Sequence, residues 1–394
     1  MAARSLLMIP GPIEVSPAVQ EAFATPPPSH VAPPVIEAFG VSLERMRAVW
    51  EAADDSQPFI VAGSGTLAME MAVVNLLDPG QKALVVSTGY FSDRMADMLQ
   101  RRGVEVVEVG APVGDAPDND EVREALELHD FDALYATHVD TSTGVRVDAE
   151  SLAKLGREYD VLSVFDGVCA TAAERFRMKE WGADVYLTAS QKAIGLPPGL
   201  ALLVASSRAM QARRDLDTPP PKSMDFHEWL PIMEAYEARQ PSYFATPATN
   251  LINALAVGLD EILETEFAGR TGVEARFDQH ENAADAMRAA WSPMGLELLP
   301  EDELAANTLS AVKYPDGIDS SVLGSIKERG VIVAGGLYPG RKKDYFRVGH
   351  MGYVIELADQ LRATVTAVAE SLNEHGFDVD TDAAVAAFDE VFAG

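Results

Sequence analysis

Lys192 lies in the segment Ser190-Gln191-Lys192, between two apolar runs, and it follows Asp166 by 26 residues. An ammonium group in an apolar setting carries a large desolvation cost unless it is paired, deprotonated or covalently consumed. A lysine that forms a Schiff base with a carbonyl compound avoids that cost and becomes a catalytic group. The alternative is a surface lysine in a helix-to-strand loop, so the neighbouring motifs must decide between the two.

Three further segments combine suitable side chains with a suitable place in the chain. Gly63-Ser64-Gly65-Thr66 stands between a predicted strand and a predicted helix, where backbone N–H groups and a hydroxyl can approach an anion. Asp166 directly follows an apolar strand, at the end where α/β sheets place ligand contacts. Residues 137–144 (THVDTSTG) also follow a strand and offer several hydroxyls. Each segment has an ordinary structural alternative, namely a tight turn, a helix N-cap and a capping loop, and His138 fits a structural loop residue.

The elements that must position these residues alternate between strands and helices, as in βαβ units. Continuous apolar runs of this length are typical of strands buried on both faces, and therefore of a mostly parallel sheet covered by helices. Helices are expected at 67–77, 93–102, 119–129 and 149–159. Seven strands are expected at residues 59–62, 83–86, 104–109, 133–137, 161–165, 185–188 and 200–205.

With 394 residues the chain is longer than one modest core requires, which predicts two domains. Residues 1–16 are rich in proline and predict an extended arm. We expect a large domain over residues 17–264, which ends with a long amphipathic helix at 249–263. Residues 265–394 change rhythm and predict a smaller α+β domain, with a strand at 345–348.

The charge balance is strongly acidic, with 61 Asp and Glu against 31 Lys and Arg and a net charge of −30. Such a surface repels phosphate backbones, and the only basic cluster, Arg341-Lys342-Lys343, is short, so nucleic-acid binding is not expected. High salt screens the repulsion within an acidic fold, so this composition indicates a salt-adapted, halophilic habitat.

Other counts exclude further classes of protein. No apolar run reaches the length of a membrane span, and the N-terminus lacks a basic stretch followed by an apolar core, so we expect a soluble cytoplasmic protein. The single cysteine, Cys169, excludes an internal disulfide framework and a thiolate metal cluster. No metal site is predicted.

Several short motifs follow one another along nearly the whole chain, and their order and spacing are more specific than any one of them. They are Pro10-Gly11-Pro12, Gly63-Ser64-Gly65-Thr66, the 137–144 loop, Asp166, Ser190-Gln191-Lys192 with Pro197-Pro198-Gly199, Tyr243-Phe244-Ala245-Thr246-Pro247 and Arg347-Val348-Gly349. This series resembles the class V, fold type I, aminotransferases that depend on pyridoxal phosphate (PLP), specifically the alanine–glyoxylate and serine–glyoxylate branch. The resemblance implies a large domain with a mostly parallel seven-stranded sheet and a smaller α+β C-terminal domain.

The resemblance assigns the two catalytic residues and the cofactor contacts. By this resemblance, Lys192 is the Schiff-base lysine, and Asp166 keeps the pyridine nitrogen of PLP protonated so that the ring withdraws electrons. Gly65 and Thr66 would bind the phosphate at a helix N-terminus, and Gln191 would contact the phosphate or the ring edge.

It also assigns substrate contacts and a partner. Arg347 matches the arginine that binds the substrate α-carboxylate, a task suited to its planar fork, and Thr141 would contact the ring or the substrate. Tyr243 and Thr246 would contact the phosphate held by a neighbouring subunit, which implies an obligate homodimer. One departure concerns the ring face, where the family often has a Trp. Here Phe91 is the candidate for stacking on the ring.

We therefore predict an aminotransferase that moves an amino group from a small amino acid to glyoxylate or pyruvate with ping-pong kinetics. Its partners would be an amino acid and a 2-oxo acid. A dicarboxylate donor needs a second cation in the pocket, and the motif segments offer no arginine besides Arg347. Arg341 to Lys343 is expected in an exposed loop, and His30 in a solvated turn. Alanine or serine is therefore the predicted donor.

Alternatives within the fold remain at this stage. A transaminase that uses aspartate, aminoethylphosphonate or a ureide would have the same motifs. A cysteine desulfurase needs a reactive cysteine on a mobile loop of the small domain, whereas Cys169 stands beside Asp166 and is expected to pack beneath the site. A non-catalytic PLP-fold protein that binds a partner would not need an intact Lys, Asp and Arg set.

Overall fold

The computed structural model describes residues 4–392, and its largest element is a seven-stranded sheet with the strand order β2-β10-β9-β8-β5-β3-β4. Neighbouring strands are parallel except at β10, which runs antiparallel to both β2 and β9. The predicted mostly parallel sheet is confirmed. Its strands are β2 (Gln57–Ala62), β3 (Lys82–Ser87), β4 (Glu105–Gly110), β5 (Ala133–Thr137), β8 (Leu162–Asp166), β9 (Val185–Ala189) and β10 (Leu200–Ala205).

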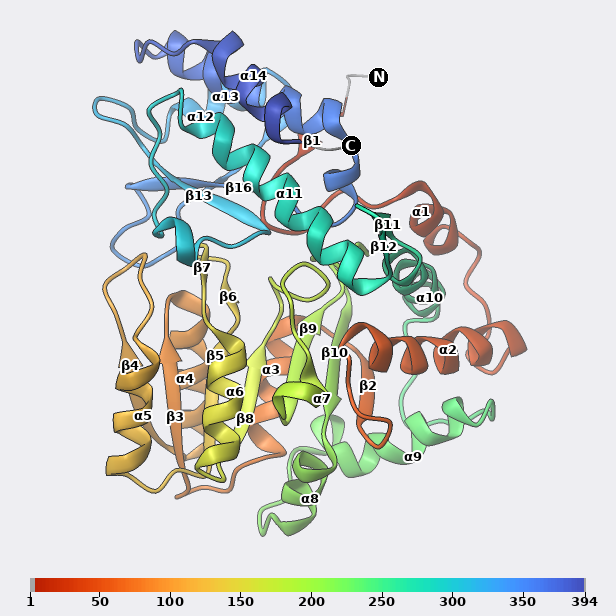
Figure 1. Ribbon diagram of the computed structural model, residues 1–394. Coiled ribbons are helices and arrows are strands. Elements are labelled where there is room, and N and C mark those ends of the chain that lie inside the picture. Colours follow the sequence, from red (N-terminus) through yellow and green to blue (C-terminus); the bar gives the residue numbers. More distant parts are fainter. Residues whose placement is uncertain (1–3, 393–394) are drawn as a thin grey trace.

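Burial of both faces explains why these strands are continuous apolar runs. Every residue of β5, β8, β9 and β10 is buried, whereas β4, at the edge of the sheet, has no buried residue. Helix α3 contacts β9 and β10, α4 contacts β3 and β4, and α6 contacts β5 and β8 (Figure 1). The helices that pack on these strands are α3 (Gly65–Val74), α4 (Tyr90–Arg102), α5 (Asn119–Leu128) and α6 (Ala149–Glu158).

A second group of helices lies beside the β2 end of the sheet (Figure 1). Within it, the amphipathic helix predicted at 249–263 is confirmed as α10, which packs on α2 and α1. Two helices before it, α8 and α9, were not predicted. The helices are α1 (Pro17–Phe23), α2 (Pro33–Val49), α8 (Ser207–Asp215), α9 (Phe226–Glu237) and α10 (Thr249–Leu263).

The C-terminal part has its own three-stranded antiparallel sheet, in the order β13-β16-β15, with helices packed around it above the large sheet (Figure 1). The strand predicted at 345–348 is β16. These elements are α11 (Val273–Trp291), β13 (Leu309–Lys313), α12 (Val322–Glu328), β14 (Val331–Ile332), β15 (Ala334–Gly335), β16 (Tyr345–Gly349), α13 (Ala358–Glu374) and α14 (Thr381–Val391).

The N-terminal arm joins this C-terminal part. Strand β1 (Leu6–Leu7) pairs in parallel with β14, and Met8 is fully buried in a hydrophobic cluster whose other buried members fall between residues 283 and 388. The larger cluster draws its buried members from residues 19 to 277. The division at residues 264 and 265 between a large and a small domain remains a prediction.

Short elements complete the described chain. The hairpin of β6 (Val139–Asp140) and β7 (Val145–Arg146) follows β5 and carries the loop that the sequence singled out. The others are α7 (Met178–Trp181), β11 (Glu266–Phe267), β12 (Arg270–Thr271) and the 3₁₀ turns η1 (Lys222–Met224), η2 (Asp302–Leu304) and η3 (Gly352–Glu356).

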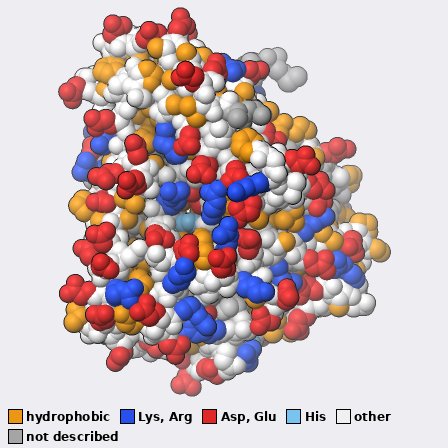
Figure 2. Space-filling view, viewed as in Figure 1, with side chains coloured by type: hydrophobic (Ala, Val, Ile, Leu, Met, Phe, Trp, Pro, Cys, Tyr) orange, Lys and Arg blue, Asp and Glu red, His pale blue; other side chains and the backbone are white. Residues whose placement is uncertain are grey.

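The surface is acidic, as the composition requires. Figure 2 shows Asp and Glu side chains over most of the visible face, with Lys and Arg side chains among them near its middle. Within residues 4–392, no helix is long and apolar enough to cross a membrane. The same residues contain no group of three or more His, Cys, Asp or Glu side chains that could hold a metal ion.

Candidate active site

A cavity of about 230 Å³ opens at the carboxyl ends of β5, β8 and β9, where parallel sheets place their ligands. It contains seven of the predicted site residues: Lys192, Asp166, Gly65, Thr66, Phe91, Thr141 and Gln191. Its other lining residues are Gly11, Ser64, Met69, Arg94, Thr137, Val139 and Val168. Five of the sequence motifs, those around Gly11, Gly65, Thr141, Asp166 and Lys192, therefore meet at one place in the fold.

Lys192 follows the end of β9 and lies almost buried against the N-terminal arm, with 7% of its surface exposed. Its Nζ donates a hydrogen bond to the Pro10 carbonyl. Gly11 has a φ of +99°, and a Cβ there would stand 2.6 Å from Cδ of Lys192, so only glycine fits both the backbone and the space. Burial lowers the pKa of the ammonium group, and the negative charge of Asp166 opposes that shift. The neutral amine that a nucleophile needs is therefore favoured.

Asp166 is the last residue of β8 and is 2% exposed. Its Oδ1 accepts one hydrogen bond, from the N–H of Val168 at 2.9 Å, and no ion pair joins the carboxylate to any residue from 4 to 392. Burial raises the pKa of Asp166 to about 6, and the nearby Asp140 carboxylate adds to the effect. A cationic N–H donor in the cavity would lower this cost, as a protonated ring nitrogen would.

The start of α3 can receive an anion. Ser64 is its N-cap residue but makes no capping hydrogen bond, so N–H groups of the first turn are available to a ligand. A Cβ at Gly65 would stand 2.9 Å from Cγ2 of Val168, so a larger residue at position 65 would clash with the Val168 side chain. Oε1 of Gln191 is buried and has no hydrogen-bond partner within residues 4–392, which is costly unless a ligand supplies a donor.

Arg94 is a site residue that the sequence analysis missed. Its Nη1 donates to Oγ1 of Thr66 at 3.3 Å, and its guanidinium carbon lies 4.9 Å from the ring centroids of both Phe91 and Tyr90. No ion pair joins Arg94 to a carboxylate among the described residues. One signal was present, because Arg94 follows Phe91 by three positions on α4 and so lies on the same face of that helix. Arg94 lies outside the motif segments, so the structure adds a second arginine that those segments do not contain.

Arg347 lies on β16 and is 9% exposed, just outside the residues that line the cavity. Its Nη1 donates to the Thr141 carbonyl at 3.0 Å, and its Nε donates to the Gly335 carbonyl at 2.9 Å. Burial lowers the pKa of the guanidinium, and no ion pair within residues 4–392 neutralises it. A buried unpaired arginine beside the cavity suits a carboxylate ligand.

Tyr243 and Thr246 do not reach the cavity. Tyr243 is 63% exposed, its hydroxyl lies 3.4 Å from Oγ1 of Thr246, and its ring lies 5.3 Å from the ring of His30. Their role in the site of a neighbouring subunit stays a prediction.

His138 and Cys169 are both buried. Nδ1 of His138 lies 3.0 Å from the Tyr186 hydroxyl, and burial lowers the pKa of the imidazole to about 3, so this side chain is a neutral part of the core. Sγ of Cys169 lies 3.6 Å from Oγ1 of Thr308, in a small apolar cluster with Ala193 next to Lys192. A cysteine packed there does not lie on a mobile loop, as the reactive cysteine of a desulfurase must.

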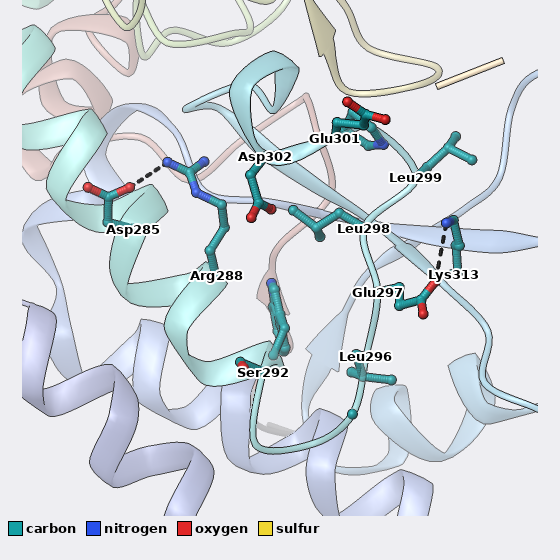
Figure 3. A pocket seen from close by; sticks show the side chains of 13 residues that line it. Asp285, Arg288, Ser292, Leu296, Glu297, Leu298, Leu299, Glu301, Asp302 and Lys313 are labelled. Carbon is teal, nitrogen blue, oxygen red and sulfur yellow. Dashed lines mark hydrogen bonds and ion pairs between the residues drawn. The ribbon is translucent and has the colours of Figure 1, made fainter. Parts of the chain in front are cut away.

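A larger cavity, of about 910 Å³, lies elsewhere, along the C-terminal half of α11 and the loop that follows it (Figure 3). Both of its basic side chains are paired with acidic ones. Arg288 bonds Asp285 at 2.6 Å, and Lys313 pairs with Glu297 at 3.3 Å. None of the predicted site residues lines it, so its size does not make it the active site.

Comparisons with known proteins agree with this geometry. The aminotransferase class-V family matches residues 37–337. Alanine–glyoxylate aminotransferase 1 of Saccharomyces cerevisiae is 39% identical over 366 residues, which is 88% of this chain and 91% of that protein. L-aspartate–glyoxylate aminotransferase of Paracoccus denitrificans is 31% identical over 99% of this chain and 96% of its own. The crystal structure of alanine–glyoxylate aminotransferase from Nostoc sp. superposes with a TM-score of 0.86 and 28% identity, covering 94% of this chain and 96% of that one. The chain belongs to the class-V aminotransferases and is a transaminase with their PLP-dependent fold.

Proposed function

We propose that this transaminase binds PLP in the cavity beside Lys192 and moves an amino group from alanine or serine to glyoxylate or pyruvate. The family implies the cofactor. One observation carries the proposal. A buried lysine, a buried carboxylate without an ion pair and a helix N-terminus whose N–H groups can bind an anion all line one cavity. When bound, PLP supplies an aldehyde that condenses with amines and a ring that withdraws electrons from the substrate Cα.

The residues that line the cavity would have different tasks. Nζ of Lys192 would hold the cofactor and would take and return the proton of the substrate Cα, a role that its lowered pKa favours. The Asp166 carboxylate would accept a hydrogen bond from the N–H of the ring. The first turn of α3, Thr66 and Arg94 receive the phosphate, because N–H donors and a guanidinium both suit a dianion.

The aromatic and aliphatic walls would orient the ring. Phe91 and Val168 line the cavity from α4 and from the segment after β8. Arg347 would bind the carboxylate that amino and oxo substrates share, with Thr141 beside it.

A second candidate function is a transaminase that prefers a dicarboxylate donor. Arg94 carries no ion pair among the described residues and lines the same cavity as Lys192, so it offers the second cation that such a donor needs. The relative from Paracoccus denitrificans is named for aspartate. We favour the small donors because Arg94 bonds Thr66, at the proposed phosphate end.

A panel of donors separates the two candidates. With glyoxylate as acceptor and in high salt, kcat/KM for alanine or serine is expected to exceed that for aspartate and glutamate. A preference of about tenfold or more for aspartate, the scale of one charge-assisted hydrogen bond, would reverse the assignment. In that case Arg94→Gln should lower kcat/KM for aspartate and leave that for alanine unchanged.

Arg347→Lys is expected to raise KM for both the amino acid and the oxo acid. Loss of the bidentate fork costs about 2 kcal/mol, which corresponds to roughly a 30-fold increase in KM. Steady-state kinetics with each substrate varied in turn measures this, and Arg288→Lys, in the larger cavity, is the matched control. An unchanged KM for both substrates would place the carboxylate-binding residue elsewhere.

Assembly and location are further proposals. An exposed Tyr243 beside Thr246 supports a homodimer in which these residues contact the cofactor phosphate of the neighbouring subunit. The cytoplasmic location and the halophilic habitat rest on composition, in particular on the net charge of −30.

A further inference from the structure

Asp140, the last residue of β6, is a buried carboxylate for which the proposed reaction has no direct use. Its side chain is fully buried, and no ion pair joins it to another residue between 4 and 392. Burial raises the pKa of Asp140, and hydrogen bonds from Ser142 are the largest effect opposing that rise. A buried charge without a cation is costly, so a specific set of donors must compensate for it.

One set of donors comes from the start of α4. Oδ2 of Asp140 accepts hydrogen bonds from the N–H of Phe91 at 2.9 Å and of Ser92 at 3.2 Å. The Ser142 hydroxyl accepts from the N–H of Tyr90 at 2.9 Å. The helix itself begins after a glycine, which has no side chain to cap these groups.

The glycine is needed for this arrangement. A Cβ at Gly89 would stand 2.5 Å from Cγ of Asp140 and 2.6 Å from Oγ of Ser142. The turn after β6 therefore caps α4 from outside, and this cap fixes where the Phe91 ring and Arg94 enter the cavity.

The same turn also contacts two side chains of β16. Oδ1 of Asp140 accepts from the N–H of Ser142 at 2.9 Å and from its hydroxyl at 2.6 Å, which fixes the turn itself. The next carbonyl along, that of Thr141, accepts from Arg347 at 3.0 Å. The Ser142 carbonyl accepts from the Tyr345 hydroxyl, so two side chains of β16 rest on this turn.

We propose that Asp140 is a positioning residue, which fixes the Phe91 ring in the cavity and, through the Thr141 carbonyl, the Arg347 guanidinium beside it. The inference rests on the proposed function, because the positions of Phe91 and Arg347 matter together only if one contacts a cofactor and the other a carboxylate substrate. In this role Asp140 acts through Phe91 and Arg347 and contacts neither the cofactor nor the substrate itself.

The test compares Asp140→Asn with Asp184→Asn. Asp184 is likewise buried and accepts from a backbone N–H and a serine hydroxyl. It differs in its ion pair with Arg208 at 3.0 Å and in its place before β9, at the opposite end of the strands from the cavity. Readouts are the Kd for PLP by absorbance titration, KM and kcat for alanine and glyoxylate, and the midpoint of thermal unfolding.

An amide at position 140 turns an N–H₂ group toward N–H donors, so Asp140→Asn is expected to weaken PLP binding and to raise both KM values by about tenfold each. Asp184→Asn should lower the unfolding midpoint and leave the Kd and both KM values unchanged. Ser142→Ala, which removes one donor to Asp140 and the acceptor for Tyr90, should act in the same direction with a smaller effect and serves if the first variant does not fold.

Two results would overturn the inference. The first is a Kd for PLP and KM values within twofold of the parent in Asp140→Asn or, if that variant does not fold, in Ser142→Ala. The second is an equal increase in Kd and KM in Asp184→Asn. A parent protein that binds no PLP would instead refute the proposed function, so the two failures are distinguishable.

Discussion

Replacing Lys192 with alanine is expected to leave a folded protein that has lost transamination by several orders of magnitude. The substitution removes both the proposed covalent anchor of the cofactor and the base at the substrate Cα, and no second lysine among residues 4–392 lines the cavity. The fold should persist, because the side chain makes a single hydrogen bond, to Pro10, and its burial carries a desolvation cost. Amino transfer is measured at saturating PLP, and circular dichroism verifies the fold.

Lys179→Ala is the control, since Lys179 is exposed on α7 and outside the cavity. Turnover near that of the parent in Lys192→Ala, with PLP saturating, would show that another residue carries the chemistry. A matching loss in the control would point to a nonspecific effect on the protein.

The second large effect is expected from Asp166→Asn. An amide cannot hold a ring nitrogen in its protonated form, so the electron-withdrawing power of the ring falls and kcat should drop by roughly a hundredfold or more. The variant should still bind PLP, because the phosphate contacts at α3 and the lysine remain. Removal of an unpaired buried carboxylate, whose pKa is raised to about 6, should not destabilise the fold.

The measurement is kcat in the parent, in Asp166→Asn and in Asp184→Asn, which removes a buried carboxylate away from the cavity that is paired with Arg208 at 3.0 Å. A kcat equal to that of the parent would make Asp166 a structural residue of the strand end, the alternative that the sequence left open.

Much of the fold could be predicted because local patterns determine it. Strands β5, β8 and β10 are short apolar runs buried on both faces, and α10 has one apolar face, so each has a signal in its own residues. Helix α9 was missed because Pro231 interrupts its pattern, and because its N-cap, Asp225, depends on an ion pair with Arg213 at 2.7 Å.

Long-range pairings had no local signal either. The arm was expected to be extended, but its pairing with β14, more than 300 residues away in sequence, is decided by tertiary packing. Met8 is fully buried, whereas Leu6 and Leu7 are half-buried, with Leu6 packed against the same hydrophobic cluster as Met8.

The residues of the candidate site also differ in whether the sequence alone could indicate them. Lys192 and Asp166 were found because a charged side chain at the end of an apolar strand is visible in the sequence. Arg94 and Asp140 were missed because their importance depends on contacts with residues 28 and 49 positions away, Thr66 and Phe91. Such contacts exist only once the sheet has brought separate loops to one edge.

Reduction with borohydride tests the central claim, that Lys192 carries the cofactor, most directly. The protein is loaded with PLP, reduced, digested and sequenced by mass spectrometry, so that a reduced carbon–nitrogen bond marks the lysine that held the cofactor. We predict the phosphopyridoxyl mass on the peptide that contains Lys192 and on none of the other eight lysines in comparable yield. Modification of another lysine instead, or no modification of a protein that binds PLP, would contradict the account.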